Sequence, residues 1–124
     1  LTHHIDMARY SGACDMKDEP AAAKEWDSCD VHAYYAAIEK YRIAGIFYGH
    51  THARNIYRWN GTPEKTLTGL PVFNVDNSAH FNNDAQAFFY VEISPTETLV
   101  RELSTKNRWQ ASEWTPLSWR VKLT

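Results

Sequence analysis

The 124-residue sequence lacks an apolar run of about 18 residues, so none of its segments is expected to span a membrane. It also lacks a concentration of charge. The formal net charge is −2, and there is no basic stripe of the kind that nucleic-acid binding requires. Internal repeats and low-complexity stretches are absent as well. The length suits one domain, and a hydrophobic fraction of 44% is sufficient for a core.

Cysteine is scarce: only Cys14 and Cys29 are present. Two cysteines do not make a metal framework without further ligands. One disulfide and two free thiols are both compatible with the sequence, and it does not decide between them. A disulfide would indicate an oxidising compartment and therefore a periplasmic or secreted protein.

An initiator methionine and a signal-peptide pattern are also missing from the start of the chain. Leu1–Thr2 has the character of the end of a strand whose earlier part is not included. We therefore expect this chain to be a segment of a longer protein.

The first half of the chain combines a long polar stretch with one helix and one buried strand. Residues His3–Asp30 are polar and irregular, with a short helix expected from Pro20. The spacing of apolar residues predicts an amphipathic helix over Val31–Arg42, with Asp30 as its N-cap. Ile43–Gly49 is apolar without alternation, which is typical of a strand buried on both faces.

The second half reads as successive strands separated by turns. An aromatic fraction of 14% favours sheets over a helical bundle. The predicted strands are Asn55–Trp59, Leu70–Asp76, Ala85–Ser94, Thr98–Thr105 and Trp119–Leu123. Turns of antiparallel connections are expected at Asn60-Gly61 and Ser94–Glu97. The predicted fold class is α/β, becoming β-rich towards the C-terminus.

Two histidines, His50 and His52, follow the buried strand directly, after Gly49. Ligands of open α/β sheets bind at the carboxyl ends of strands, and glycine permits a sharp turn there. Two imidazoles one residue apart suit two adjacent cations better than one ion, and imidazole binds Zn, Fe, Mn or Ni. A polar loop without function is the alternative for this pair alone.

A second pair, His3 and His4, also follows a strand-like end. The helix would return the chain across the sheet, so the strand Ile43–Gly49 would lie parallel to the first and beside it. We therefore expect both histidine pairs to emerge at the same edge of the sheet.

Other polar residues are weaker candidates. His32, near the helix start, is interpreted as a solvated or packed side chain, and His80 as part of a surface loop that could reach the edge of the site. Three carboxylates could orient histidine rings, and the sequence does not select among Asp6, Asp76 and Asp84.

The motif GHTH (Gly49–His52), preceded by a strand that ends in HH at residues 3–4, resembles the C-terminal half of the calcineurin-like metallophosphoesterase family. The strand-rich tail "GLPVFNVDNSAHF" followed by "AQAFFYVEI" also resembles that family's region after its GHxH motif. The resemblance covers most of the chain. It implies a β-sandwich flanked by helices, with a dinuclear metal centre at the strand ends.

The resemblance also implies roles for individual residues. His50 would bind one metal ion and His52 the other, while His3 would join His50 on the same ion. His4 would lie near the substrate phosphate as a catalytic donor. The two ions would be divalent or trivalent, chosen from Mn, Fe, Zn or Ni. Ile5 stands where the family often has proline, which leaves the path of that loop open.

The family's other ligands come from D-x-H, GD and GNH motifs of its N-terminal half, which are absent here. The whole chain, 1–124, is therefore interpreted as the C-terminal segment of one such domain, with the N-terminal half of the same protein as its partner.

The leading functional hypothesis is part of a metal-dependent phosphoesterase that hydrolyses phosphomonoesters or phosphodiesters. The alternative is an inactive binding or scaffolding domain of the same fold. A third hypothesis is a carbohydrate-binding module, which would use Trp59, Trp109, Trp114 and Trp119. Aromatic core packing is the simpler explanation of these tryptophans.

Overall fold

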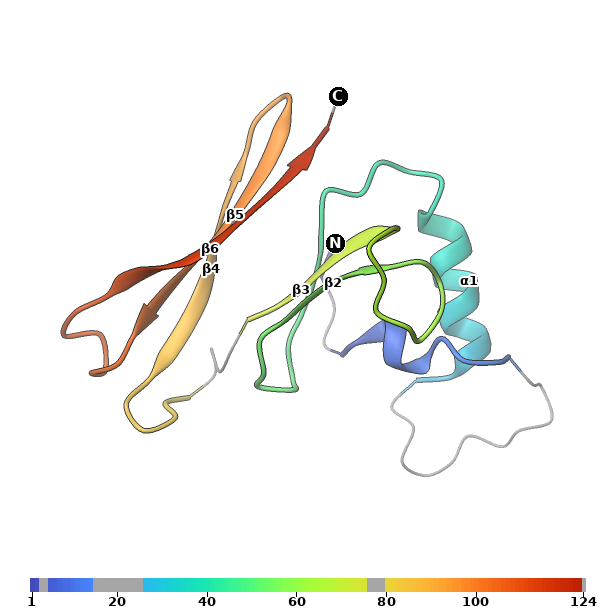
Figure 1. Cartoon of the computed structure of the whole chain (residues 1–124). Helices are drawn as coiled ribbons and strands as arrows, with labels where there is room; N and C mark the ends of the chain where they lie inside the picture. The colour runs from blue at the N-terminus through green and yellow to red at the C-terminus, as the bar shows by residue number, and fades with distance from the viewer. Residues whose placement is uncertain (3–4, 15–25, 76–79, 124) are drawn as a thin grey trace. The chain divides into compact units, whose positions relative to one another are not determined.

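The computed structural model describes residues 1–2, 5–14, 26–75 and 80–123. They form one 3-10 helix, one α-helix and two three-stranded sheets, so the chain is mostly sheet with little helix (Figure 1). The elements are η1 (Met7–Tyr10), α1 (Ser28–Ile38), β1 (Ile46–Tyr48), β2 (Asn55–Trp59), β3 (Leu70–Asn74), β4 (Gln86–Ile93), β5 (Glu97–Thr105) and β6 (Glu113–Lys122).

The chain divides into two compact units. The first unit comprises Leu1–His50 and Tyr57–Val72, and the second comprises Thr51–Ile56 and Phe73–Thr124. Neither helix of the described residues combines the length and the apolar character needed to cross a bilayer.

The α-helix begins earlier and ends earlier than the sequence predicts. Its N-cap is Asp27, whose carboxylate accepts hydrogen bonds from the backbone N–H groups of Cys29 (2.8 Å) and Asp30 (3.1 Å). The prediction of Asp30 as the cap is therefore wrong. Asp30 lies in the first turn instead, where its negative charge interacts favourably with the positive end of the helix dipole. At the other end, Tyr41 N–H bonds to Ile38 C=O across three residues, which closes the helix before the predicted end at Arg42.

A disulfide joins Cys14 to Cys29, with 4.7 Å between the two Cα atoms. Of the two alternatives that the sequence left open, the structure has the disulfide. Cys29 lies in the first turn of α1, so the bond ties the start of the helix to the segment that follows η1. The short helix expected from Pro20 falls on residues outside the described part of the chain.

The first sheet has the strand order β1-β3-β2. Thr2 pairs with Phe47 in a parallel bridge, and Phe47 N–H donates to Leu1 C=O at 2.9 Å. The N-terminal amine of Leu1 also donates to Gly45 C=O at 3.1 Å. The prediction that the start of the chain lies parallel to and beside the buried strand is thus confirmed. The strand itself is shorter than predicted, Ile46–Tyr48 instead of Ile43–Gly49.

The core of the first unit is built around Trp59, which is 1% exposed. Val31 from α1 and Ile46 from β1 are buried in the same cluster. The rings of Tyr34 and Tyr35 pack on Trp59, with centroids 6.3 and 4.9 Å away. The apolar face of the predicted helix is therefore the face that covers this tryptophan.

The second sheet is an antiparallel meander, β4-β5-β6. The turn predicted at Ser94–Glu97 is confirmed, because Ser94 N–H donates to Glu97 C=O at 2.9 Å and β4 pairs with β5. The last strand begins at Glu113 and not at Trp119 as predicted. It contains Pro116, which has no N–H to donate, and its position at the edge of the sheet tolerates such a residue.

The coarse prediction is confirmed: a helix lies in the front half, and the chain is β-rich towards its C-terminus. A β-sandwich flanked by helices stays a prediction.

Candidate functional site

The histidine loop follows β1 and turns sharply. His50 and His52 have φ angles of 72° and 52°, in the left-handed region that L-residues rarely adopt. The sequence suggested that Gly49 would provide the turn, but the positive φ angles fall on the two histidines. Conformations of this kind cost about 1–3 kcal/mol each and occur often at functional loops, where neighbouring contacts hold them.

Asn74, at the end of β3, holds the histidine loop in place. The residue is 1% exposed, and its side-chain amide donates to Thr51 Oγ1 and to Ala53 C=O, both at 2.6 Å. Sequence reasoning missed this residue. The available signal was a polar amide at the end of the fully buried strand Leu70–Asn74, where only a hydrogen-bonded polar group is stable.

His80 contacts the loop from further along the chain. The centroids of its ring and the ring of His52 lie 4.5 Å apart, at an interplanar angle of 73°. His80 is exposed, as expected of a surface loop, and it also reaches the candidate site. Two imidazoles in contact offer nitrogen ligands to one transition-metal ion.

The predicted convergence of both histidine pairs is not tested, because His3 and His4 lie outside the described residues, as does Asp76. Within the described ranges, no group of three or more His, Cys, Asp and Glu side chains is placed to hold a metal ion.

Asp6, one of the suggested orienting carboxylates, is bonded to two tyrosines in the first unit. Its Oδ1 accepts a short hydrogen bond from the Tyr57 hydroxyl, and its Oδ2 accepts one from the Tyr48 hydroxyl at 3.3 Å. Burial raises the pKa of Tyr57, and the hydrogen bond to Asp6 raises it further. The Tyr57 hydroxyl therefore remains protonated and serves as a donor.

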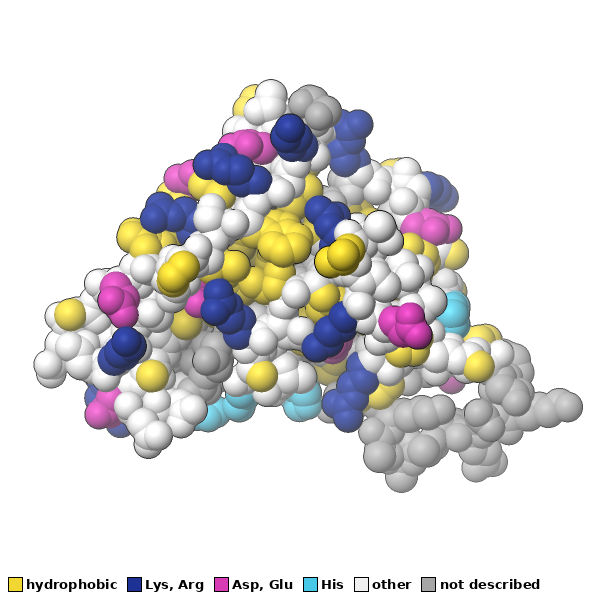
Figure 2. Space-filling model, viewed as in Figure 1, with side chains coloured by type: hydrophobic (Ala, Val, Ile, Leu, Met, Phe, Trp, Pro, Cys, Tyr) yellow, Lys and Arg dark blue, Asp and Glu magenta, His cyan; other side chains and the backbone are white. Residues whose placement is uncertain are grey.

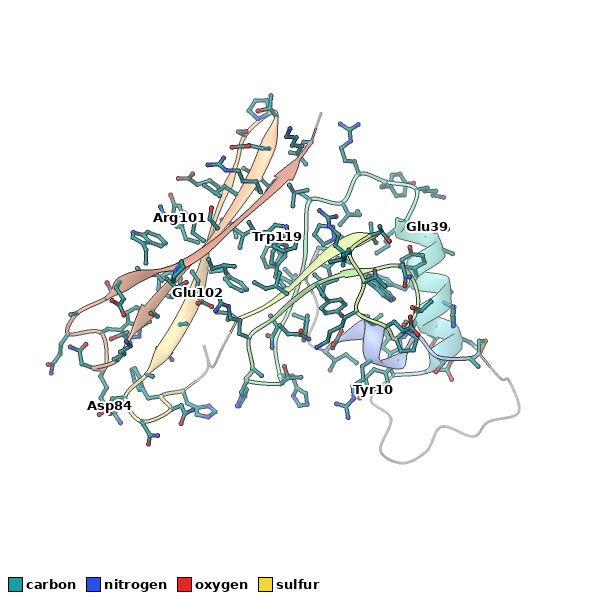
Figure 3. The ribbon with its side chains drawn as sticks, in the orientation of Figure 1. Tyr10, Glu39, Asp84, Arg101, Glu102 and Trp119 are labelled. Atoms are coloured by element: carbon teal, nitrogen blue, oxygen red, sulfur yellow. A yellow bond between two sulfur atoms is a disulfide. The ribbon has the colours of Figure 1, made fainter. Side chains whose placement is uncertain are left out.

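Asp84 and His32 also have defined partners. Asp84, which is labelled in Figure 3, forms an ion pair with Arg108, with 2.5 Å between Oδ1 and Nε. His32 Nε2 lies 2.6 Å from Gly12 C=O, so this ring is a packed side chain, as interpreted from the sequence.

The four tryptophans do not form one exposed platform. Trp59 is a core residue, Trp109 and Trp119 are half-buried, and Trp114 is 44% exposed. Tyr90 meets Trp114 edge-on at 5.7 Å. Arg101 covers the face of Trp114, with its guanidinium carbon 3.9 Å from the ring centroid. The core-packing explanation therefore holds for Trp59.

Charged side chains are mixed on the face shown in Figure 2, where Lys and Arg lie among Asp, Glu and apolar residues.

No protein-family model matches this chain, and no curated protein is similar to it in sequence. Two crystal structures of Vps29 from Entamoeba histolytica are similar to it at low identity. A single mutant has 16% identity and a TM-score of 0.41, and a double mutant has 17% and 0.42. Each match covers 83% of this chain and 51% of the other, so the chain spans about half the length of those proteins. TM-scores this low do not establish a shared fold.

Proposed function

We propose that this chain is the C-terminal part of a metallophosphoesterase-like domain that acts as a binding or scaffolding module. The GHTH loop after β1 supports the family, and the state of two carboxylates supports the non-catalytic role. Asp6 is bonded to Tyr57 and Tyr48, and Asp84 is paired with Arg108. Two of the three carboxylates that could orient histidine rings in a metal centre thus have other side chains as partners.

The proposed module has at most partial metal occupancy. His52 of the histidine loop and His80 from further along the chain offer adjacent rings, which suit one ion of the Zn or Ni type. The Cys14–Cys29 disulfide supports an oxidising compartment for the protein.

The test is metal content together with hydrolysis of a generic aryl phosphate, measured on this chain and on the longer protein that contains it. We expect fewer than two ions per molecule and no metal-dependent turnover in either. Two ions per molecule with metal-dependent turnover in the longer protein would overturn the binding-module proposal.

The second candidate is the phosphoesterase itself, and the parallel pairing of Thr2 with Phe47 favours it. The pairing places the start of the chain parallel to β1 and beside it, as the βαβ arrangement of this hypothesis requires. In this case His3 and His50 would hold one metal ion, His52 would hold the second, and His4 would act on the phosphate. Two such ions neutralise phosphoester charge and lower the pKa of a bound water. The N-terminal half of the protein would supply the remaining ligands.

For this second candidate, His50→Ala in the longer protein should abolish metal-dependent turnover while the fold is retained. His32→Ala is the matched control, since His32 bonds to Gly12 and is assigned no ligand role. Full activity of His50→Ala would remove His50 from the ligand set.

A further inference from the structure

Strand β5 carries a carboxylate where its pattern calls for an apolar side chain. Alternate residues of the strand are buried: Thr98 is 2% exposed, Val100 is 0% exposed and Glu102 is 4% exposed. Side chains two residues apart lie on the same face of a strand. Glu102 therefore belongs to the buried face, where an ionised carboxylate is costly unless it is paired and hydrogen-bonded.

The sheet is irregular at this residue. Arg101 pairs with Ser118 of β6 and Leu103 pairs with Trp114, with a shift of register between them. In β4, Phe89 is paired with Glu102. In β6, no residue is paired with Glu102, because the register shifts at this point. Bulges of this kind re-aim a side chain and are frequent beside binding sites. Figure 3 labels Arg101 and Glu102 next to each other on this strand.

The carboxylate is only partly satisfied. Its Oε2 atom lies 3.5 Å from Arg54 Nε and has no hydrogen-bond partner among the described residues. A charge-assisted N–H···O bond is normally about 2.7–2.9 Å long. The Glu102 side chain is 5% exposed, whereas that of Arg54 is 44% exposed. The Glu102 carboxylate therefore has unused acceptor capacity, with Arg54 as its ion-pair partner among the described residues.

A cavity lies against this carboxylate. Its volume is about 240 Å³, and all of its lining residues belong to the second unit. Besides Arg54 and Glu102, the lining is rich in hydroxyl and amide side chains: Asn82, Gln86, Ser104, Thr105 and Thr115, with Lys106. One buried water needs a volume of only about 10–15 Å³, so this cavity exceeds the space for a single bridging water.

We propose that this cavity binds a neutral polyhydroxylated ligand of the size of one monosaccharide. Hydroxyl groups can donate to the Glu102 carboxylate and accept from Arg54. They can also accept from Lys106, whose ammonium lies 3.5 Å from Glu113 Oε1. Arg54 already balances the charge of Glu102, and Lys106 adds a further positive charge, so a cationic ligand is disfavoured. Ligand pockets typically measure about 300–1,000 Å³. This cavity of about 240 Å³ lies just below that range, which limits the ligand to a single ring.

Arg54 comes from the end of the histidine loop, but the site contains none of the histidines. It depends neither on metal binding nor on the proposed function. Its residues also differ from the tryptophans that suggested a carbohydrate module. The recognition would come from a buried carboxylate and a guanidinium at a strand bulge.

The test is two-dimensional amide NMR of the whole 124-residue chain. D-glucose, D-galactose, D-mannose and myo-inositol are titrated separately, with methylammonium chloride as the cationic comparison. We expect at least one polyol to cause saturable shifts concentrated at Glu102, Ser104 and Thr105, and methylammonium to cause none there. The proposal is wrong if no polyol gives saturable shifts at these residues, or if only methylammonium does.

Three variants give the test a second readout. Glu102→Gln retains the shape but loses the charge, and should weaken polyol binding by about tenfold or more, since a hydrogen bond to a charged group is lost. The matched control is Glu97→Gln on the same strand, where Glu97 pairs with Arg120 at the surface, and it should bind as the parent does. If Glu102→Gln does not fold, Ala85→Leu fills the cavity from another wall and should abolish the shifts. Unchanged binding in a folded Glu102→Gln or Ala85→Leu variant would overturn the assignment.

Discussion

Asn74 is the residue on which the histidine loop depends most directly. Replacing it with alanine removes both hydrogen bonds to the loop and leaves the part-buried Ala53 carbonyl without this donor. We expect Asn74→Ala to lower the free energy of unfolding by about 1–3 kcal/mol. Urea denaturation measures this change. Asn60→Ala is the matched control, because Asn60 is exposed and bonds only within its own turn, and it should stay within about 0.5 kcal/mol. Equal losses in the two variants would contradict the role of Asn74.

Tyr57 gives the first unit a defined response to alkaline pH. Its folded pKa lies above its unfolded pKa, because of burial first and the bond to Asp6 second. The unfolded chain loses this proton above about pH 10 while the folded chain retains it, so the free energy of unfolding falls as pH rises. Tyr57→Phe should remove up to about 1.4 kcal/mol per pH unit of that slope above pH 10. Denaturation at a series of pH values measures it, and an unchanged slope would show that Tyr57 ionises equally in both states.

At the residue scale, the sequence shows which residue types form a candidate motif. It does not show which distant residues will hydrogen-bond to one another in the fold. His50 and His52 attract notice because two imidazoles follow a buried strand. Asn74 and Asp6 acquire their roles from partners more than 20 positions away, such as the Thr51 hydroxyl and the Tyr57 hydroxyl. No local pattern encodes those partners. The contact between His52 and His80 is of the same kind.

Among the elements, the connection between β2 and β3 contains the least replaceable glycine. Gly69 has a φ angle of 107°, and a Cβ atom there would lie 2.1 Å from the backbone oxygen of Trp59. Since the obstructing atom is backbone, the chain itself must move, and Gly69→Ala should cost about 2 kcal/mol or more.

Gly12→Ala is the control for this prediction, because a Cβ at Gly12 meets nothing within 4 Å. It should leave the melting temperature nearly unchanged, whereas Gly69→Ala should lower it by several degrees. Similar melting temperatures for the two variants would contradict the close approach of Gly69 to Trp59.

The helices and strands also show where sequence patterns are sufficient to predict the bounds of an element. Asn55–Trp59 was predicted with its observed bounds, and β4 and β5 nearly so, because alternation and turn residues act locally. The start of α1 was misplaced because Asp27 and Asp30 are equally good caps in sequence, and only the observed bonds to Cys29 and Asp30 N–H distinguish them. The start of β6 was missed because Pro116 is compatible with an edge strand, and edge position is a property of the sheet.

For the whole molecule, the disulfide is the strongest covalent constraint. Cys14 and Cys29 are separated by 15 positions, and a crosslink of that span is worth about 3 kcal/mol through the entropy of the unfolded chain. The double variant Cys14→Ser/Cys29→Ser should therefore lower the urea midpoint substantially. Reduction of the parent chain should have the same effect and should not affect the variant further. A parent chain whose midpoint is insensitive to reductant would contradict a stabilising disulfide.

The division of the chain into units has a consequence for how this protein can change over evolution. The chain passes from the first unit to the second at Thr51, returns at Tyr57 and leaves again at Phe73. Neither unit is one uninterrupted stretch of sequence. A single recombination breakpoint therefore cannot transplant either unit intact into another gene, and the two are inherited together. The six-residue excursion Thr51–Ile56, which begins within the GHTH motif, is the part of the chain that makes them inseparable.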